Sequence, residues 1–89
     1  NVYKAQKGLI RVSKIVENEK IIEIRITGDF FIYPETALEI LENMLVNVKD
    51  TKEDIETVVN NFFKVTKAQT PFVSKNDFVL AIAGVENEG

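Results

Sequence analysis

The stretch "GLIRVSKIVENEKIIEIRITG", residues 8–28, decides the fold, because apolar and polar residues alternate on both sides of a short polar turn. β-Branched residues dominate it, and a period of two is typical of a strand with one buried and one exposed face. Residues 17–20 are few enough for a hairpin turn, in which Asn18 can adopt a positive φ. The sequence therefore predicts an antiparallel hairpin.

The same alternation predicts which side chains face the core. The apolar residues that share the inner face are Ile10, Val12 and Val16 in the first strand and Ile22, Ile24 and Ile26 in the second. An isolated hairpin is only marginally stable in water, so a third strand or a helical layer must cover it. Two segments are candidates for the third strand, "VYKAQ" at the start and "DFFIY" after Gly28.

After residue 33 the apolar residues recur at three- and four-residue steps, which indicates helices. The predicted elements are strands within about 2–32, helices at about 34–48, 51–64 and 75–84, and a frayed tail at 85–89. Strands followed by helices indicate the α+β class. We therefore predict a single domain over residues 1–89, with a small antiparallel sheet of two to three strands covered on one face by three helices.

Several residues are suited to the ends of these helices. Pro34 fits the first turn of the first helix. Thr51 with Asp54, or Asp50 with Glu53, has the spacing of a capping box at the start of the second helix. Ser74 with Asp77 has the same spacing at the third, where Val73 and Phe78 fit a hydrophobic staple and Gly84 fits a C-terminal cap.

The composition argues against several classes of function. The 89 residues include neither His nor Cys, which removes the usual general base, the most reactive nucleophile and the commonest metal ligand. No glycine-rich phosphate loop, signal peptide or membrane-length apolar run occurs. We therefore expect no catalytic residue, no metal site and no membrane association, and a cytoplasmic protein that is not catalytic on its own.

Charge is distributed unevenly along the chain. Residues 1–28 carry six Lys or Arg against three Glu, whereas residues 29–63 carry two Lys against eight Asp or Glu. Lys4, Lys7, Arg11 and Lys14 could form a basic stripe, yet a sequence pI of about 4.9 does not favour nucleic-acid binding. Two opposed docking surfaces and two solvated faces both remain open.

The corner "GDFF", residues 28–31, is the candidate site. A carboxylate beside a glycine often bonds nearby backbone amides and fixes a turn, but Asp29 could equally serve an interface or a ligand. Successive side chains of a strand point to opposite faces, so Phe30 and Phe31 cannot both be buried unless Gly28 introduces a bulge. An exposed aromatic residue on a small domain is a common docking anchor.

The sequence resembles the C-terminal accessory domain of lipoate-protein ligases, in particular the accessory subunit of ligases that are split into two polypeptides. The motifs that carry the resemblance are "GLI" at 8–10, "ITGDFF" at 26–31 and "TPFVSKNDFVLAIAG" at 70–84. The resemblance covers nearly the whole chain, and it implies that this domain binds a separate catalytic subunit as a heterodimer.

The resemblance also implies different roles for the two subunits. The catalytic subunit would hold lipoate, ATP and Mg²⁺ and form lipoyl-adenylate, and the lipoyl group would then pass to a lysine of a lipoyl carrier domain. This chain would bind none of these cofactors alone but would help the activation step. The residues implied at the contact are Gly28, Asp29, Phe30, Phe31, Lys7 and Gly8.

Two alternatives come from other classes of protein. One is a generic protein–protein interaction module with no link to lipoate. The other is an independent enzyme that uses Asp29 as its acid or base, which would require that residue to lie in a cleft with a raised pKa.

Overall fold

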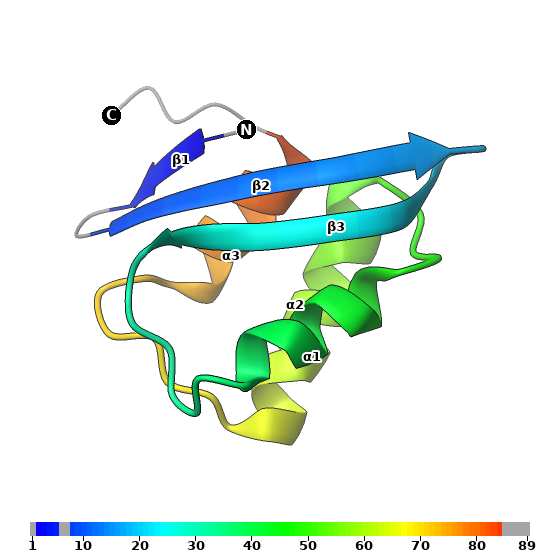
Figure 1. Ribbon diagram of the computed structural model, residues 1–89. Coiled ribbons are helices and arrows are strands. Elements are labelled where there is room, and N and C mark those ends of the chain that lie inside the picture. Colours follow the sequence, from blue (N-terminus) through cyan, green and yellow to red (C-terminus); the bar gives the residue numbers. More distant parts are fainter. Residues whose placement is uncertain (1, 6–7, 85–89) are drawn as a thin grey trace.

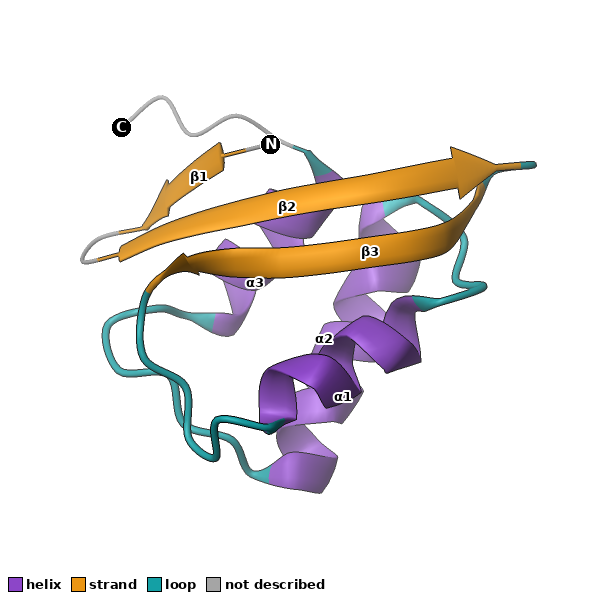
Figure 2. Ribbon diagram, in the orientation of Figure 1, coloured by secondary structure: helices purple, strands orange, loops and turns teal. Residues whose placement is uncertain are grey.

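A computed structural model describes residues 2–5 and 8–84 (Figure 1). Within these residues the elements, in chain order, are β1 (Val2–Ala5), β2 (Gly8–Glu17), β3 (Lys20–Asp29), α1 (Ala37–Leu45), α2 (Lys52–Thr66) and α3 (Lys75–Ala83). The strands form an antiparallel sheet in the order β1-β2-β3, and the helices all lie on one of its faces (Figures 1 and 2). The predicted α+β class is confirmed, and the third strand is the segment at the start of the chain.

The β2–β3 hairpin closes through a two-residue turn. Glu17 pairs with Lys20, and the two residues between them, Asn18 and Glu19, have φ values of 51° and 68°. Positive φ at both central positions is the turn geometry whose twist matches that of the flanking strands. The polar stretch at 17–20 therefore forms the tight turn that its sequence predicts.

A β-bulge in β3 changes which isoleucines are buried. The register shifts between Ile15 and Val16, and Ile22 has no partner in the β2–β3 ladder. The extra residue reverses the alternation in β3, so Ile21 is fully buried while Ile22 is 39% exposed. The predicted inner face was therefore wrong at Ile22 and right at Ile10, Val12, Ile24 and Ile26. Val16 pairs with Ile21 near the hairpin turn, and it is 39% exposed although β2 itself has no inserted residue.

The core lies between the inner face of the sheet and the three helices. Its largest fully buried side chains are Phe62, Phe78, Ile10, Ile21, Leu41, Leu45, Ile55, Ile82, Val59 and Val79. Burial of one such side chain favours folding by about 1.5–3 kcal/mol, so the helical layer supplies the cover that the hairpin needs.

Helix α1 is shorter than the predicted 34–48 at both ends. Pro34 follows a cis peptide bond and belongs to a turn, in which the Ala37 N–H donates to the Pro34 carbonyl at 3.0 Å. At the other end, Asn47 and Val48 leave the helix and bond the backbone of Ile21 at 2.7 and 2.9 Å. Tertiary pairing with β3 thus replaces the last helical turn.

The predicted caps of the other helices are present. Thr51 accepts a hydrogen bond from the Asp54 N–H at 3.2 Å, and Ser74 and Asp77 form a complete capping box. Gly84 ends α3 in the left-handed conformation, with φ 85°. Val73 and Phe78 are both buried, as a staple requires. The predicted tail at 85–89 lies outside the described residues.

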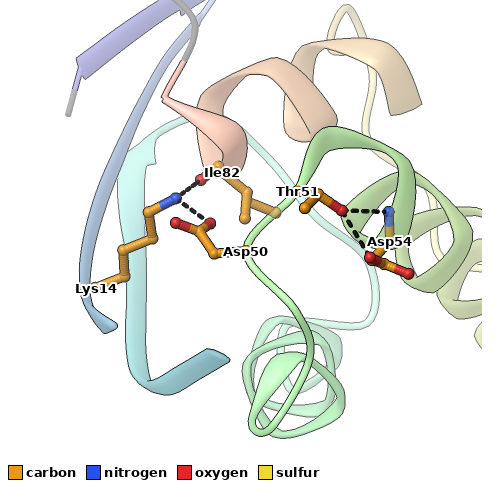
Figure 3. Close-up of polar contacts among 5 residues, drawn as sticks. All are labelled: Lys14, Asp50, Thr51, Asp54 and Ile82. Carbon is orange, nitrogen blue, oxygen red and sulfur yellow. Dashed lines mark hydrogen bonds and ion pairs between the residues drawn. The ribbon is translucent and has the colours of Figure 1, made fainter. Parts of the chain in front are cut away.

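The Lys14 side chain links β2 to the connection between α1 and α2 and to α3 (Figure 3). Its Nζ donates to Asp50 Oδ1 and to the Ile82 carbonyl, both at 2.6 Å. The Lys14 and Asp50 side chains are 15% and 24% exposed, so this ion pair is partly shielded from solvent. Because Lys14 bonds toward the helices whereas Arg11 is exposed, the predicted basic stripe does not include Lys14.

A second long-range hydrogen bond fastens β1 to α3. The buried Tyr3 hydroxyl donates to Asp77 Oδ1 at 2.9 Å, across 74 positions of sequence. Burial raises the pKa of Tyr3, and the hydrogen bond to Asp77 and the negative charge of that carboxylate raise it further.

Candidate docking surface

Two glycines make room for Phe30 where β3 ends. A Cβ on Gly28 would overlap the Leu9 carbonyl oxygen and lie 2.9 Å from the Phe30 ring. A Cβ on Gly8 would lie 3.0 Å from the Asp29 carbonyl oxygen and 3.3 Å from Phe30 Cβ. The half-buried Phe30 ring packs edge-on against Phe78, with ring centroids 5.3 Å apart. Gly8, Gly28 and Phe30 therefore shape the corner and anchor it to the core.

Phe31 points the other way and is 68% exposed. Its ring stacks parallel to that of Tyr33, with centroids 6.5 Å apart and an angle of 3° between the ring planes. Tyr33 is itself 53% exposed. The predicted split of the Phe30–Phe31 pair into one inward and one outward ring is therefore correct.

A second loop lies beside this segment. Tyr33 and Gln69 exchange both backbone hydrogen bonds, each at 2.9 Å, so residues 30–34 and 67–73 run side by side (Figure 1). This second loop carries Phe72, which is 65% exposed and helps to line a shallow hollow with Val73, Ser74 and Asp77. We call Phe31, Tyr33 and Phe72 the aromatic corner.

Sequence reasoning missed two of these three residues. Tyr33 appeared only in the candidate third strand "DFFIY", and Phe72 had no predicted role in a site. The available signal was that each large aromatic residue adjoins a proline, Pro34 or Pro71, outside any periodic pattern. Large rings without a periodic partner are candidates for exposure, and exposed rings gathered on adjoining loops are unusual for a small monomer.

Asp29 is exposed at the end of β3. No hydrogen bond or ion pair joins its carboxylate to another residue in the described part of the chain, so among these residues it fixes no backbone amide of the corner. Nor does it have the buried setting that an independent acid or base would require. Lys7, the other charged residue implied at the contact, lies outside the described residues.

The surface is suited to binding a protein. Large aromatic rings fixed on a rigid scaffold supply contact area at a small cost in conformational entropy. Across residues 2–5 and 8–84, no three acidic, His or Cys side chains are grouped so that they could hold a metal ion. No helix within these ranges has the length and apolar character needed to cross a membrane.

Comparison with known proteins identifies the class. The model of the family described as bacterial lipoate protein ligase C-terminus matches residues 1–82. This chain belongs to that family, which confirms the resemblance seen in the sequence.

Two relatives from Thermoplasma acidophilum are similar along most of the chain. Lipoate-protein ligase A subunit 2 is 38% identical over 80 residues, which cover 90% of this chain and 82% of that protein. The solved structure of an archaeal lipoylation system contains a bipartite lipoate protein ligase and its E2 lipoyl domain. One of its chains matches with a TM-score of 0.84 and 37% identity, over 91% of this chain and 89% of the other.

Proposed function

We propose that this protein is the accessory subunit of a two-polypeptide lipoate-protein ligase. In this role it binds a separate catalytic subunit in the cytoplasm as a heterodimer and promotes the ATP-dependent activation of lipoate to lipoyl-adenylate. The observation that carries the proposal is the similarity, over nine-tenths of the chain, to subunit 2 of the Thermoplasma acidophilum ligase.

The aromatic corner is the proposed contact with the catalytic subunit. Phe31 and Tyr33 offer exposed rings, whereas Gly8, Gly28 and Phe30 hold the segment that carries them. The stacked rings are the best hot-spot candidates, because interface energy concentrates in a few large aromatic anchors. Asp29 lies beside them with its carboxylate available to a donor of the partner.

The chemistry belongs to the catalytic subunit in this proposal. Lipoate, ATP and Mg²⁺ are bound there, and the acyl group passes from there to a lysine of the lipoyl carrier domain. The accessory subunit contributes closure: a rigid domain packed over the binding loops orders them and excludes water, which would hydrolyse the reactive mixed anhydride.

The test is lipoate-dependent exchange between ATP and pyrophosphate, which measures adenylate formation directly. We expect exchange by the cognate catalytic subunit to require this chain, and to fall in parallel with binding for Phe31→Ala. Val65→Ala is the matched control, because Val65 is also 68% exposed but lies on α2. Exchange that is unchanged by this chain, without detectable binding, would refute the proposal.

Charge gives a second test of orientation. The basic strands, rather than the acidic helix α2, are proposed to face the partner or its anionic nucleotide. Charge reversal at both Lys7 and Arg11 should slow association, and the slowing should diminish at high salt. Reversal at Lys52 and Lys64 on α2 is the control. Association that responds equally to both pairs would contradict the proposed orientation.

The alternative, a generic interaction module, gives a different result in the same assay. Such a module would bind a partner through the aromatic corner but leave the exchange reaction unaltered. The two functions are therefore separated by measuring binding and exchange on the same samples.

A further inference from the structure

β3 is an edge strand of the sheet, and only half of its outer edge is covered. Near its start, Ile21 exchanges backbone hydrogen bonds with Asn47 and Val48, and Lys20 forms an isolated bridge with Lys49. The connection between α1 and α2 therefore pairs with this end of the strand. Beyond Ile21 the edge is not paired with backbone in the described part of the chain.

Along the uncovered half, the direction of the β3 backbone groups is known. The Ile26 N–H donates outward, to the Glu42 carboxylate, at 2.6 Å. Alternate residues of an antiparallel strand direct their backbone groups to the same side, so Ile24 and Gly28 also present theirs outward. Neither has a hydrogen-bond partner on that side among the residues that the structure describes. The carbonyl groups of these three residues point to the same side as their N–H groups.

A groove runs along this half of the edge, between β3 and the start of α1. Its lining is Ile24, Arg25, Ile26, Thr27, Glu35, Leu38, Glu39 and Glu42. Three carboxylates and one guanidinium give the groove a net negative charge. Leu38, Ile24 and Ile26 supply an apolar floor. A strand edge beside such a groove is the geometry in which an extended peptide adds to a sheet.

We propose that an extended segment of the catalytic subunit, carrying Lys or Arg side chains, adds to the sheet as a fourth strand along Ile24–Gly28. Its backbone would pair with the outward groups of Ile24 and Gly28 and would replace the Glu42 carboxylate at the Ile26 N–H. Its cationic side chains would meet Glu35 and Glu39. The identity of the partner rests on the proposed function. Residues 29–34, which carry Phe31 and Tyr33, connect β3 directly to Glu35 in the lining of the groove, so one partner could reach both surfaces.

A second copy of this chain fits the edge less well. Two β3 strands paired about a twofold axis would form one continuous sheet with both α1 helices on the same face. The glutamates that line one groove would then approach those of the other, and like charges across an interface oppose association. A cationic segment has the complementary charge.

The experiment is residue-resolved amide hydrogen exchange by NMR, on the labelled chain alone and bound to its unlabelled, purified cognate catalytic subunit. Strand addition should slow exchange of the Ile24 and Gly28 amides by tenfold or more. The Ile26 amide, which already donates to Glu42, and the Arg25 and Thr27 amides, which already face β2, should change less. The two sets of amides lie on one strand, so they serve as mutual controls.

Charge variants provide the second readout. The double variant Glu35→Lys/Glu39→Lys should raise the Kd of the complex about tenfold. The control is Glu53→Lys/Glu56→Lys, two exposed glutamates of α2, with Glu53 in its first helical turn as Glu39 is in that of α1. The Kd of the control should stay within about twofold of the original.

Each outcome decides the proposal. Selective slowing at Ile24 and Gly28, together with the effect at Glu35 and Glu39, would support it. A complex that activates adenylation while these amides exchange as in the free chain would overturn the strand addition and leave the proposed function intact. Absence of any complex would overturn both. Slowing of the same amides in the free chain at high concentration would assign the edge to a second copy and overturn the proposed occupant.

Discussion

Phe30 and Phe31 are adjacent in sequence but should respond in opposite ways to truncation. Phe30 is half-buried against Phe78, whereas Phe31 is 68% exposed and stacks only on Tyr33. We predict that Phe30→Ala lowers stability strongly. Phe31→Ala should leave the fold almost intact and weaken association with the catalytic subunit.

The magnitudes follow from burial. A Phe side chain presents about 150–250 Å² of surface, of which Phe31 buries roughly a third, so truncation should cost about 1–2 kcal/mol at most, at 25 cal/mol per Å². Phe30→Ala also removes an edge-to-face contact and leaves a gap, at a cost of about 2–3 kcal/mol. In a domain of this size, 1 kcal/mol shifts the Tm by about 4–8 °C. Phe30→Ala should thus lower the Tm by about 10–20 °C.

Thermal unfolding followed by circular dichroism measures the first effect, and titration calorimetry with the catalytic subunit measures the second. A hot-spot ring contributes about 2 kcal/mol, so Phe31→Ala should raise the Kd about 30-fold. Equal losses of Tm for the two variants would show that Phe31 belongs to the core. A Kd that changes less than about twofold would exclude Phe31 from the interface.

Three further predictions concern the fold itself. Gly28→Ala should cost about 2 kcal/mol or more in urea unfolding, because its Cβ would overlap the Leu9 carbonyl; a neutral effect would contradict the close approach. Lys14→Met should cost about 1–2 kcal/mol, since it leaves the Asp50 carboxylate and a carbonyl of α3 without their donor; unchanged urea midpoints would show that the pair contributes nothing. The pKa of Tyr3 is raised in the folded state, so its stabilising contribution is complete below pH 10 and is lost as the pH rises through the folded pKa. Tyr3→Phe should remove this part of the alkaline decline in Tm, and an identical decline in both proteins would refute that origin.

Local patterns were sufficient for most of the fold. The hairpin turn at Asn18, the caps at Thr51 and Ser74, and the stop at Gly84 depend on neighbours within a few residues, so the sequence displays them directly. The burial of Ile21 in place of Ile22 depends on a bulge, which reverses the face on one side of the inserted residue and leaves Ile24 and Ile26 as the alternation predicts.

Long-range pairing explains the remaining differences between the predicted and the observed structure. α1 ends at Leu45 because the next residues bond to Ile21, which lies more than twenty positions earlier in the chain. The aromatic corner was only partly predictable for the same reason: the Tyr33–Gln69 pairing sets the loop that carries Phe72 beside residues 30–34, and no local pattern specifies that pairing. Exposure of one ring of the Phe30–Phe31 pair did follow from strand geometry alone.

The bonds made by Lys14 and Tyr3 have a consequence for synthesis on the ribosome. Lys14 bonds the carbonyl of Ile82, 68 positions later, and Tyr3 bonds Asp77, 74 positions later. The first strands to emerge therefore cannot complete their contacts until the last helix has left the exit tunnel. The nascent hairpin must wait with its apolar face uncovered, and domains with such distant contacts fold slowly for their size. The hairpin therefore exposes its apolar face from the time β3 emerges until α3 has emerged, and during that interval it is prone to aggregate.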